Sequence, residues 1–236
     1  MRQAGRIVAE VLEGLCARVK PGVMTAALDA WAEQLIRRRG GVPSFKGYRG
    51  FPASVCISID AEIVHGIPGR RRLREGEIVS LDVGVIYEGY QGDAAITVGV
   101  GTISPVATQL IQVTQEALAA AIAAARAGQR LGDVSHAIQV TAESKGYGVV
   151  REYVGHGIGR SMHEDPQIPN FGPPGQGPLL RPGMTLALEP MVTVGDYHTR
   201  LLDDGWTVVT ADGSLSAHFE HTIAVTEGDP TILTAL

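Results

Sequence analysis

The two halves of this 236-residue sequence repeat the same order of helical segments and glycines, and this repetition restricts the fold more than any other feature. Gly22 and Gly40 follow segments of helical spacing in the first half, and Gly128 and Gly146 do so in the second, with the same separation of eighteen residues. The offset of 106 residues is close to half of the chain. Chance placement of glycines is the alternative, but the pattern favours one domain of residues 1–236 with two similar halves, about 1–104 and 105–236.

The spacing of apolar residues predicts a pair of helices in each half. A first helix is expected over residues 4–19, and a second is expected to be capped by Thr25 and to end before Gly40. The second half predicts an alanine-rich helix from about residue 106, followed by a helix that Asp133 caps and that stops at Gly146.

Segments rich in β-branched residues follow each helix pair, which predicts strands after helices in both halves. The links between these segments are too short for the crossovers that parallel strands need. We therefore expect an α+β fold with a mostly antiparallel sheet that is covered by two helix pairs. The expected strand segments are 54–59, 77–87 and 94–100 in the first half and 185–194, 206–210 and 218–226 in the second.

Two aspartates interrupt the apolar strand segments of the first half, where a carboxylate without a partner is costly. If residues 88–89 form a two-residue turn, Gly84 pairs with Asp93 and Asp82 pairs with Ala95. Asp82 and Asp93 then lie on one face as diagonal neighbours, about 7 Å apart at the backbone. The alternative is that one aspartate caps a turn while the other faces water. Their shared face favours carboxylates that meet around cations.

Carboxylates also interrupt the strand segments of the second half, at Glu189 and Glu220. Either could pair with an arginine, but four such carboxylates together with histidines favour a cation site. His156 and His163 lie in the glycine-rich segment 153–166, and their spacing differs from that of the helical zinc motif HExxH. Ligands that are mostly oxygen suit a pair of divalent cations such as manganese, iron or cobalt, with zinc as a further candidate. Two such cations can share a water and lower its pKa, which points to hydrolysis.

Charge and cysteine content exclude several classes of protein. The formal net charge of −5 gives no electrostatic reason to expect a nucleic-acid or anionic-membrane partner. Cys16 and Cys56 are too few for a disulfide framework, which fits a reducing compartment. The first residues do not resemble a signal peptide, and no apolar run approaches the roughly 20 residues that span a bilayer. We therefore expect a cytoplasmic protein without membrane contact and without specific nucleic-acid recognition.

The chain resembles the type I methionine aminopeptidases, which have the pseudo-two-fold symmetric pita-bread fold. The resemblance covers nearly the whole sequence and implies a metal-dependent aminopeptidase. Such an enzyme removes the initiator methionine from new proteins when the second residue is small and uncharged. The segments that carry the resemblance include EIVHGIPG at 62–69, SLDVGVIYEGYQGD at 80–93, REYVGHGIGRSMHEDP at 151–166, LALEPMV at 186–192 and FEHTIAVT at 219–226.

The resemblance implies a set of five metal ligands. Asp82 would bind one divalent cation, whereas Asp93 and Glu220 would bridge both cations. His156 and Glu189 would complete the second site. Two divalent cations per chain are thus implied, with cobalt, manganese, iron, zinc and nickel as candidates.

Three catalytic residues and a pocket are also implied by the resemblance. His163 would steady the scissile carbonyl and the tetrahedral intermediate, His65 would contact the substrate amide, and Glu189 would relay protons from the bridging water. No catalytic role is expected for His136, His198 and His221. The implied pocket for the methionine side chain consists of Tyr48, Phe51, Cys56, Met162 and Trp206.

The implied partners are peptides and nascent chains that begin with methionine, with transient ribosome association and a monomeric enzyme. The sequence departs from the family pattern at three positions. Met162 stands where Phe is frequent, and His218 stands where Gln is common, on the strand face of a proposed ligand, where it would retune the surroundings of the metals. Asp60 replaces a usual Asn beside a monovalent-cation site on the backbone of Glu62 and Ser216, which leaves that cation open.

Two other readings remain at this point. An X-Pro peptidase, such as aminopeptidase P or prolidase, uses the same fold and similar ligands, but those enzymes usually carry a separate N-terminal domain. A metal-free binding protein with the same shape would be expected to have lost ligands, and none of the five is missing. The chain also lacks room for the large insertion of type II methionine aminopeptidases, which favours a compact bacterial type.

Overall fold

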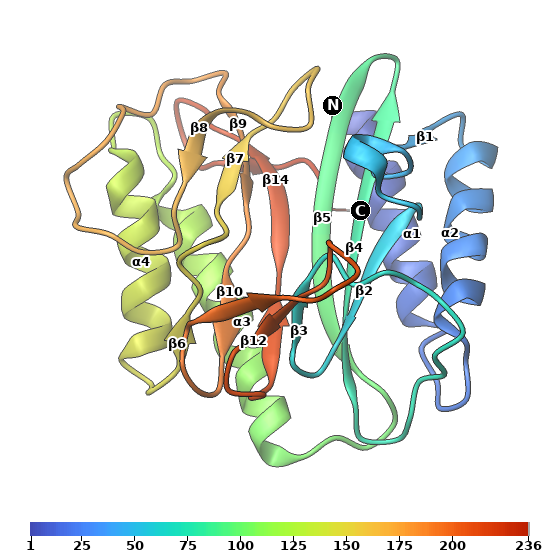
Figure 1. The fold of residues 1–236 in the computed structure, drawn as a ribbon. Helices are drawn as coiled ribbons and strands as arrows, with labels where there is room; N and C mark the ends of the chain where they lie inside the picture. The colour runs from blue at the N-terminus through green and yellow to red at the C-terminus, as the bar shows by residue number, and fades with distance from the viewer. Residues whose placement is uncertain (236) are drawn as a thin grey trace.

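A computed structural model describes residues 1–235 of the chain, and its helices form two pairs with strands between them (Figure 1). This arrangement confirms the α+β fold and the repeated helix pair. The first helix ends three residues earlier than expected, because Arg18 N–H bonds to the Leu15 carbonyl at 2.9 Å and tightens the last turn. The helices are α1 (Arg2–Cys16), α2 (Thr25–Arg38), α3 (Pro105–Ala124) and α4 (Leu131–Glu143).

The two expected helix caps are wrong. Thr25 is the first residue of α2 and follows an extended Met24, so its hydroxyl is free to accept a hydrogen bond from Gly69 N–H at 2.9 Å. Asp133 lies in the first turn of α4 and accepts a hydrogen bond from Arg130 N–H at 2.8 Å, while Arg130 itself occupies the cap position. In both cases the polar side chain secures the start of the helix from within its first turn.

The central feature is a 9-stranded antiparallel sheet with the order β1-β4-β5-β14-β9-β7-β8, to which β2 adds on β4 and β15 on β14. Strand β14 comes from the second half but pairs with β5 of the first half and with β9 of the second. The two halves therefore share one sheet. Its strands are β1 (Val42–Pro43), β2 (Val55–Ile59), β4 (Ile78–Tyr87), β5 (Tyr90–Gly99), β7 (Gly155–Gly157), β8 (Glu164–Ile168), β9 (Thr185–Leu188), β14 (Glu220–Ala224) and β15 (Thr231–Ile232).

Two small sheets complete the fold, with orders β13-β10-β6 and β11-β12-β3. In the second of these, a hairpin of the second half pairs with a strand of the first half, since Val208 lies opposite Val64. A short 3-10 helix, η1 (Tyr48–Gly50), precedes β2. The strands of the small sheets are β3 (Glu62–Val64), β6 (Gly148–Val149), β10 (Met191–Thr193), β11 (Thr199–Leu201), β12 (Val208–Thr210) and β13 (Ser216–His218).

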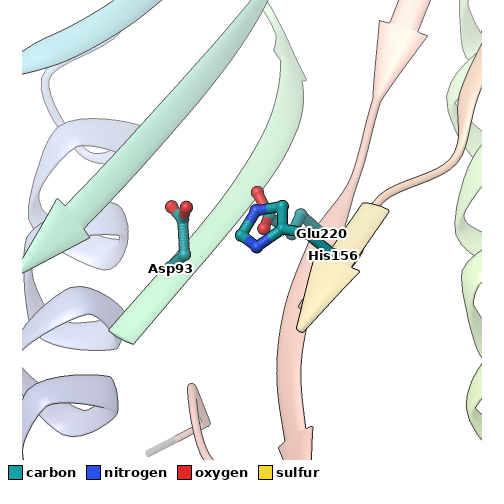
Figure 2. Close-up of side chains that lie close together, drawn as sticks. All are labelled: Asp93, His156 and Glu220. Carbon is teal, nitrogen blue, oxygen red and sulfur yellow. The ribbon is translucent and has the colours of Figure 1, made fainter. Parts of the chain in front are cut away.

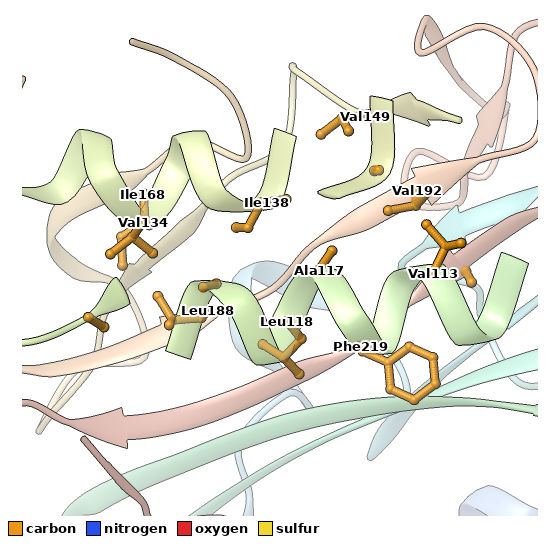
Figure 3. Close-up of a cluster of buried hydrophobic side chains, with 14 of the residues drawn as sticks. Val113, Ala117, Leu118, Val134, Ile138, Val149, Ile168, Leu188, Val192 and Phe219 are labelled. Carbon is orange, nitrogen blue, oxygen red and sulfur yellow. The ribbon is translucent and has the colours of Figure 1, made fainter. Parts of the chain in front are cut away.

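Each helix pair buries its own apolar core against the sheet. In the first half, Leu15 of α1 and Leu28 of α2 pack with Leu81 of β4. In the second half, α3 and α4 pack on β9 and on the strands that flank Phe219 (Figure 3). Ile96 contacts both cores. No helix within residues 1–235 combines the length and the apolar character needed to cross a membrane.

Candidate metal centre

The hairpin of β4 and β5 positions two carboxylates as the sequence predicts. Gly84 lies opposite Asp93, and Asp82 lies opposite Ala95. The two turn residues, Glu88 and Gly89, both have positive φ, which is the conformation of a two-residue hairpin turn whose twist matches the strands. Burial raises the pKa of Asp93, and the charge of the neighbouring Asp82 raises it further. The register thus brings two acids together on one face.

The other two carboxylates lie at breaks between strands rather than inside continuous strands. Glu189 follows the end of β9 and precedes β10, and Glu220 begins β14 directly after Phe219 separates it from β13. Both breaks were read as continuous strand segments from the sequence. Pro190 offers a physical reason for the first break, because proline cannot donate a hydrogen bond to a ladder.

His156 reaches the same place on the short strand β7. It lies opposite Ala187 of β9, and it is flanked by Gly155 and Gly157. A Cβ atom at Gly155 would lie 2.4 Å from the Ala187 carbonyl oxygen, and one at Gly157 would lie 2.2 Å from the Asp165 carbonyl oxygen. The glycines beside this histidine are therefore required by the close approach of neighbouring backbone.

Three of the expected ligands meet closely. One potential ligand atom from each of Asp93, His156 and Glu220 lies within 4.8 Å of the others, and all three residues are buried. Figure 2 shows the three side chains close together, with Asp93 from β5, His156 from β7 and Glu220 from β14. Glu189 extends this group, since its Oε1 is 3.5 Å from Nε2 of His156. Asp82 lines the same cavity.

The electrostatics of this cluster call for a cation. Among the described residues, no lysine or arginine forms an ion pair with any of the four carboxylates. Burial raises the pKa of Asp82 to about 7, and burial with mutual repulsion raises the pKa values of Asp93, Glu189 and Glu220 well above their usual range. Buried carboxylate oxygens without hydrogen-bond partners, one each on Asp82, Asp93 and Glu220, lie in the same cluster. These ligand atoms suit divalent cations. Among the described residues, no basic side chain supplies the positive charge that the buried carboxylates need.

The other two expected catalytic histidines lie around the cluster. The ring of His163 is 4.3 Å from that of His156, and its Nδ1 lies 2.8 Å from the Tyr48 hydroxyl. Burial lowers the pKa of His65 and of His156 to about 4, and the pKa of His163 is lowered first by burial and then by the charge of Arg49. These histidines are thus neutral at physiological pH. His65 has a φ of 61°, a conformation that is uncommon outside glycine and that clusters at functional sites.

All residues of the expected methionine pocket line one cavity of about 170 Å³ together with the metal cluster. Phe51 and Trp206 pack edge to face with ring centres 5.1 Å apart, and Cys56 lies opposite Asp82 on the neighbouring strand. The sequence interpretation missed two lining residues, Phe45 and Arg49. They stand close to Tyr48 and Phe51 in the sequence, and this proximity could have identified them as pocket residues.

The remaining expectations concern residues outside this cavity. His221 faces away from it and bonds through Nδ1 to the Thr234 hydroxyl, and His136 and His198 lie elsewhere on α4 and in an exposed loop. Asp60 has a φ of 56° and accepts from Ile78 N–H through its carboxylate, while its carbonyl accepts from Ser216 N–H.

Comparison with known proteins agrees with this geometry. A model of metallopeptidase family M24 matches residues 1–227. A methionine aminopeptidase of Clostridium acetobutylicum is 56% identical over 235 residues, which are 99% of this chain and 94% of that protein. The crystal structure of a methionine aminopeptidase from Thermotoga maritima superposes with a TM-score of 0.99 at 48% identity, covering 100% of this chain and 95% of that one.

The fold and the buried metal-binding cluster therefore define a metallopeptidase, and the chain belongs to family M24. Within that family it is a methionyl aminopeptidase of the bacterial type, a hydrolase that removes the initiator methionine. The likeness to X-Pro peptidases is a likeness of fold. A prolidase from Pyrococcus furiosus superposes with a TM-score of 0.81 at 21% identity, and this chain covers only 62% of it.

Proposed function

We propose that the enzyme holds two divalent cations per chain and cleaves N-terminal methionine when the second residue is small and uncharged. Asp82 would bind one cation, Asp93 and Glu220 would bridge both, and His156 and Glu189 would complete the second site. The main support is the absence of any lysine or arginine ion pair with the four carboxylates within the described residues. A bridging carboxylate offsets the repulsion between two neighbouring dications.

The chain's own residues prepare the peptide bond for hydrolysis. When bound, the cations supply a water of lowered pKa and polarise the carbonyl. Glu189 accepts the proton of the attacking water, because burial already raises the affinity of this carboxyl for protons. If the Tyr48 hydroxyl donates to Nδ1 of His163, 2.8 Å away, the ring hydrogen lies on Nε2, where it can donate to the substrate carbonyl. His65 lines the same cavity and contacts the substrate amide.

The cavity favours methionine as the first residue. Phe51, Cys56, Met162 and Trp206 offer an apolar and polarizable surface that suits an unbranched thioether. The limited volume of about 170 Å³ leaves little space beyond the side chain, which restricts the second residue to types such as Gly, Ala and Ser.

Peptide kinetics on metal-replete protein test this function. We expect rapid release of methionine from Met-Gly and Met-Ala peptides, with little cleavage of Met-Leu, Met-Lys or formyl-Met peptides. Faster hydrolysis of Leu-Gly or Gly-Pro, with the metals in place, would overturn the assignment. Metal analysis in the same samples separates a wrong substrate from a wrong cofactor.

We further propose that residues 1–236 act as a single catalytic domain and a monomer in the cytoplasm, on nascent chains that emerge from the ribosome. The support is the activity itself, since new proteins carry the initiator methionine. Two cysteines without a disulfide fit a reducing compartment. Light scattering tests the monomer, and co-sedimentation with ribosomes at two salt concentrations tests a transient electrostatic association.

A further inference from the structure

His218 is a buried polar residue that the proposed reaction does not use. It ends β13 and is only 2% exposed. Its backbone is fixed on both sides by one hydroxyl, because His218 N–H donates to Thr97 Oγ1 at 2.9 Å and the Thr97 hydroxyl donates to the His218 carbonyl at 2.8 Å. The main chain that carries the imidazole is therefore held in place.

The ring nitrogen Nε2 of His218 has no hydrogen-bond partner within the described structure. Oε2 of the Glu189 carboxylate lies 3.9 Å from this nitrogen. The other oxygen of the same carboxylate, Oε1, is 3.5 Å from Nε2 of His156. Glu189 thus lies between two imidazoles, one of which is a proposed metal ligand.

The strand pairing explains why His218 reaches Glu189. His218 lies opposite Met191 in the pairing of β13 with β10, and β10 begins two residues after Glu189. At the break between β9 and β10, Asn170 donates to the Glu189 carbonyl at 3.1 Å, but no hydrogen bond among the described residues fixes the Glu189 carboxylate. A side-chain donor on the facing strand can fix it.

We propose that His218 is a positioning residue: its unpartnered Nε2, 3.9 Å from Oε2 of Glu189, would donate to that oxygen in the metal-loaded enzyme and so direct Oε1 toward the cation shared with His156. A hydrogen on Nε2 would give this buried nitrogen an acceptor. Outer partners of this kind orient metal-binding carboxylates and tune their affinity. The inference rests on the proposed function, because it takes Glu189 to be a ligand.

The tautomer of His218 provides the first test. Protein with ¹⁵N-labelled histidine is loaded with zinc, and long-range ¹H–¹⁵N spectra assign the protonated nitrogen, with His218→Gln identifying the signal. We expect hydrogen on Nε2 of His218. An Nε2 without hydrogen, or one bonded directly to zinc, overturns this inference while the dinuclear site stands. Failure of the unmodified protein to bind zinc overturns the proposed function and this inference with it.

Metal affinity provides the second test. We expect His218→Leu to weaken zinc binding by about 10- to 100-fold in competition with a chelator. His218→Gln keeps an N–H donor and should lose less than about 10-fold. His221→Gln is the matched control, because it removes an imidazole on the opposite face of the neighbouring strand and should bind zinc normally. Equal affinity of His218→Leu and the unmodified protein contradicts the proposal, and the tautomer decides the matter if His218→Leu fails to fold.

Discussion

The two halves share one plan but position their acidic residues by different means. In the first half, β4 and β5 run for ten residues each in continuous register, and Asp82 and Asp93 lie inside them. In the second half, Glu189 and Glu220 lie where strands end or begin. The comparison teaches that the register of a long hairpin determines which side chains share a face. At a strand end, contacts with neighbouring segments determine where a side chain lies.

The breaks in the second half have a structural use. Because β9 is short, β7 can pair beside it and carry His156 to the cluster, and β10 and β13 can form a separate small sheet. The first half contributes no histidine to the close group of Asp93, His156 and Glu220. The half with regular strands supplies oxygen, and the half with interrupted strands supplies oxygen and nitrogen.

The largest effect should come from removing, in either half, one of the acids proposed to bridge the cations. We expect Asp93→Ala and Glu220→Ala each to reduce kcat/KM by more than about 10³-fold, beyond the usual loss for a single preorganised donor. Steady-state kinetics with measured metal content checks this. If only one of the two variants loses activity, the halves do not share the cations equally. Asp133→Ala, on the surface at the start of α4, serves as the control.

The two histidines proposed as catalytic offer the next comparison, since His65 belongs to the first half and His163 to the second. Their alanine variants should keep both metals but lose about 10²- to 10³-fold in turnover, because each removes one donor to the substrate. Metal analysis together with kinetics on Met-Ala peptides separates the two properties. If His163→Ala lost metal while remaining folded, His163 would have to be reassigned as a ligand.

Metal removal should weaken the connection between the halves. At a free metal concentration of 100 times Kd, stability should rise by about 2.7 kcal/mol over the metal-free protein. The folded-state pKa of Asp82 is raised to about 7, so the metal-free protein loses stability as pH rises from about 4 toward 7. Metal binding needs the ionised ligands and strengthens over the same range. The difference in Tm with and without chelator should therefore grow from pH 5 to pH 7.5, and a difference that shrinks contradicts this linkage.

The pocket draws one wall from each half. We expect Phe51→Ala and Met162→Ala to reduce kcat/KM for Met-Ala by about 10- to 200-fold, as hydrophobic pocket contacts usually do. The ratio of Met-Ala to Leu-Ala cleavage measures the specificity of each wall. A variant that lowers activity without changing this ratio acts on folding rather than on recognition.

The smallest effect should come from a contact that joins the halves at the end of the β4–β5 hairpin. Arg160 of the second half donates to the Tyr90 hydroxyl at 2.9 Å and lies 4.3 Å from the centre of its ring. We expect Arg160→Ala to cost about 0.5–1 kcal/mol of unfolding free energy with little change in kcat. Urea denaturation measures this, with Arg200→Ala as an exposed control in β11.

The hairpin of the first half could be predicted from sequence because side chains alternate along a strand with a period of two and the turn is short. Counting residues from the turn therefore predicted that Asp82 and Asp93 share one face. The helix pairs followed from apolar spacing, but their caps did not, because Thr25 and Asp133 bond to the chain from within the first turn. The strands β1, β3, β7 and β8 were not expected. Strands β1 and β3 depend on partners far away in the sequence, such as the pairing of β12 with β3, which local patterns do not encode.

The position of β14 in the sheet has a consequence for protein synthesis. This strand lies between β5 and β9, yet it carries residues 220–224, so the centre of the sheet is synthesised after both of its neighbours. Until β14 has been made, Asp93 lacks Glu220, its neighbour in the buried cluster. The enzyme that trims other newborn proteins thus assembles its own metal-binding group only after β14 has been synthesised.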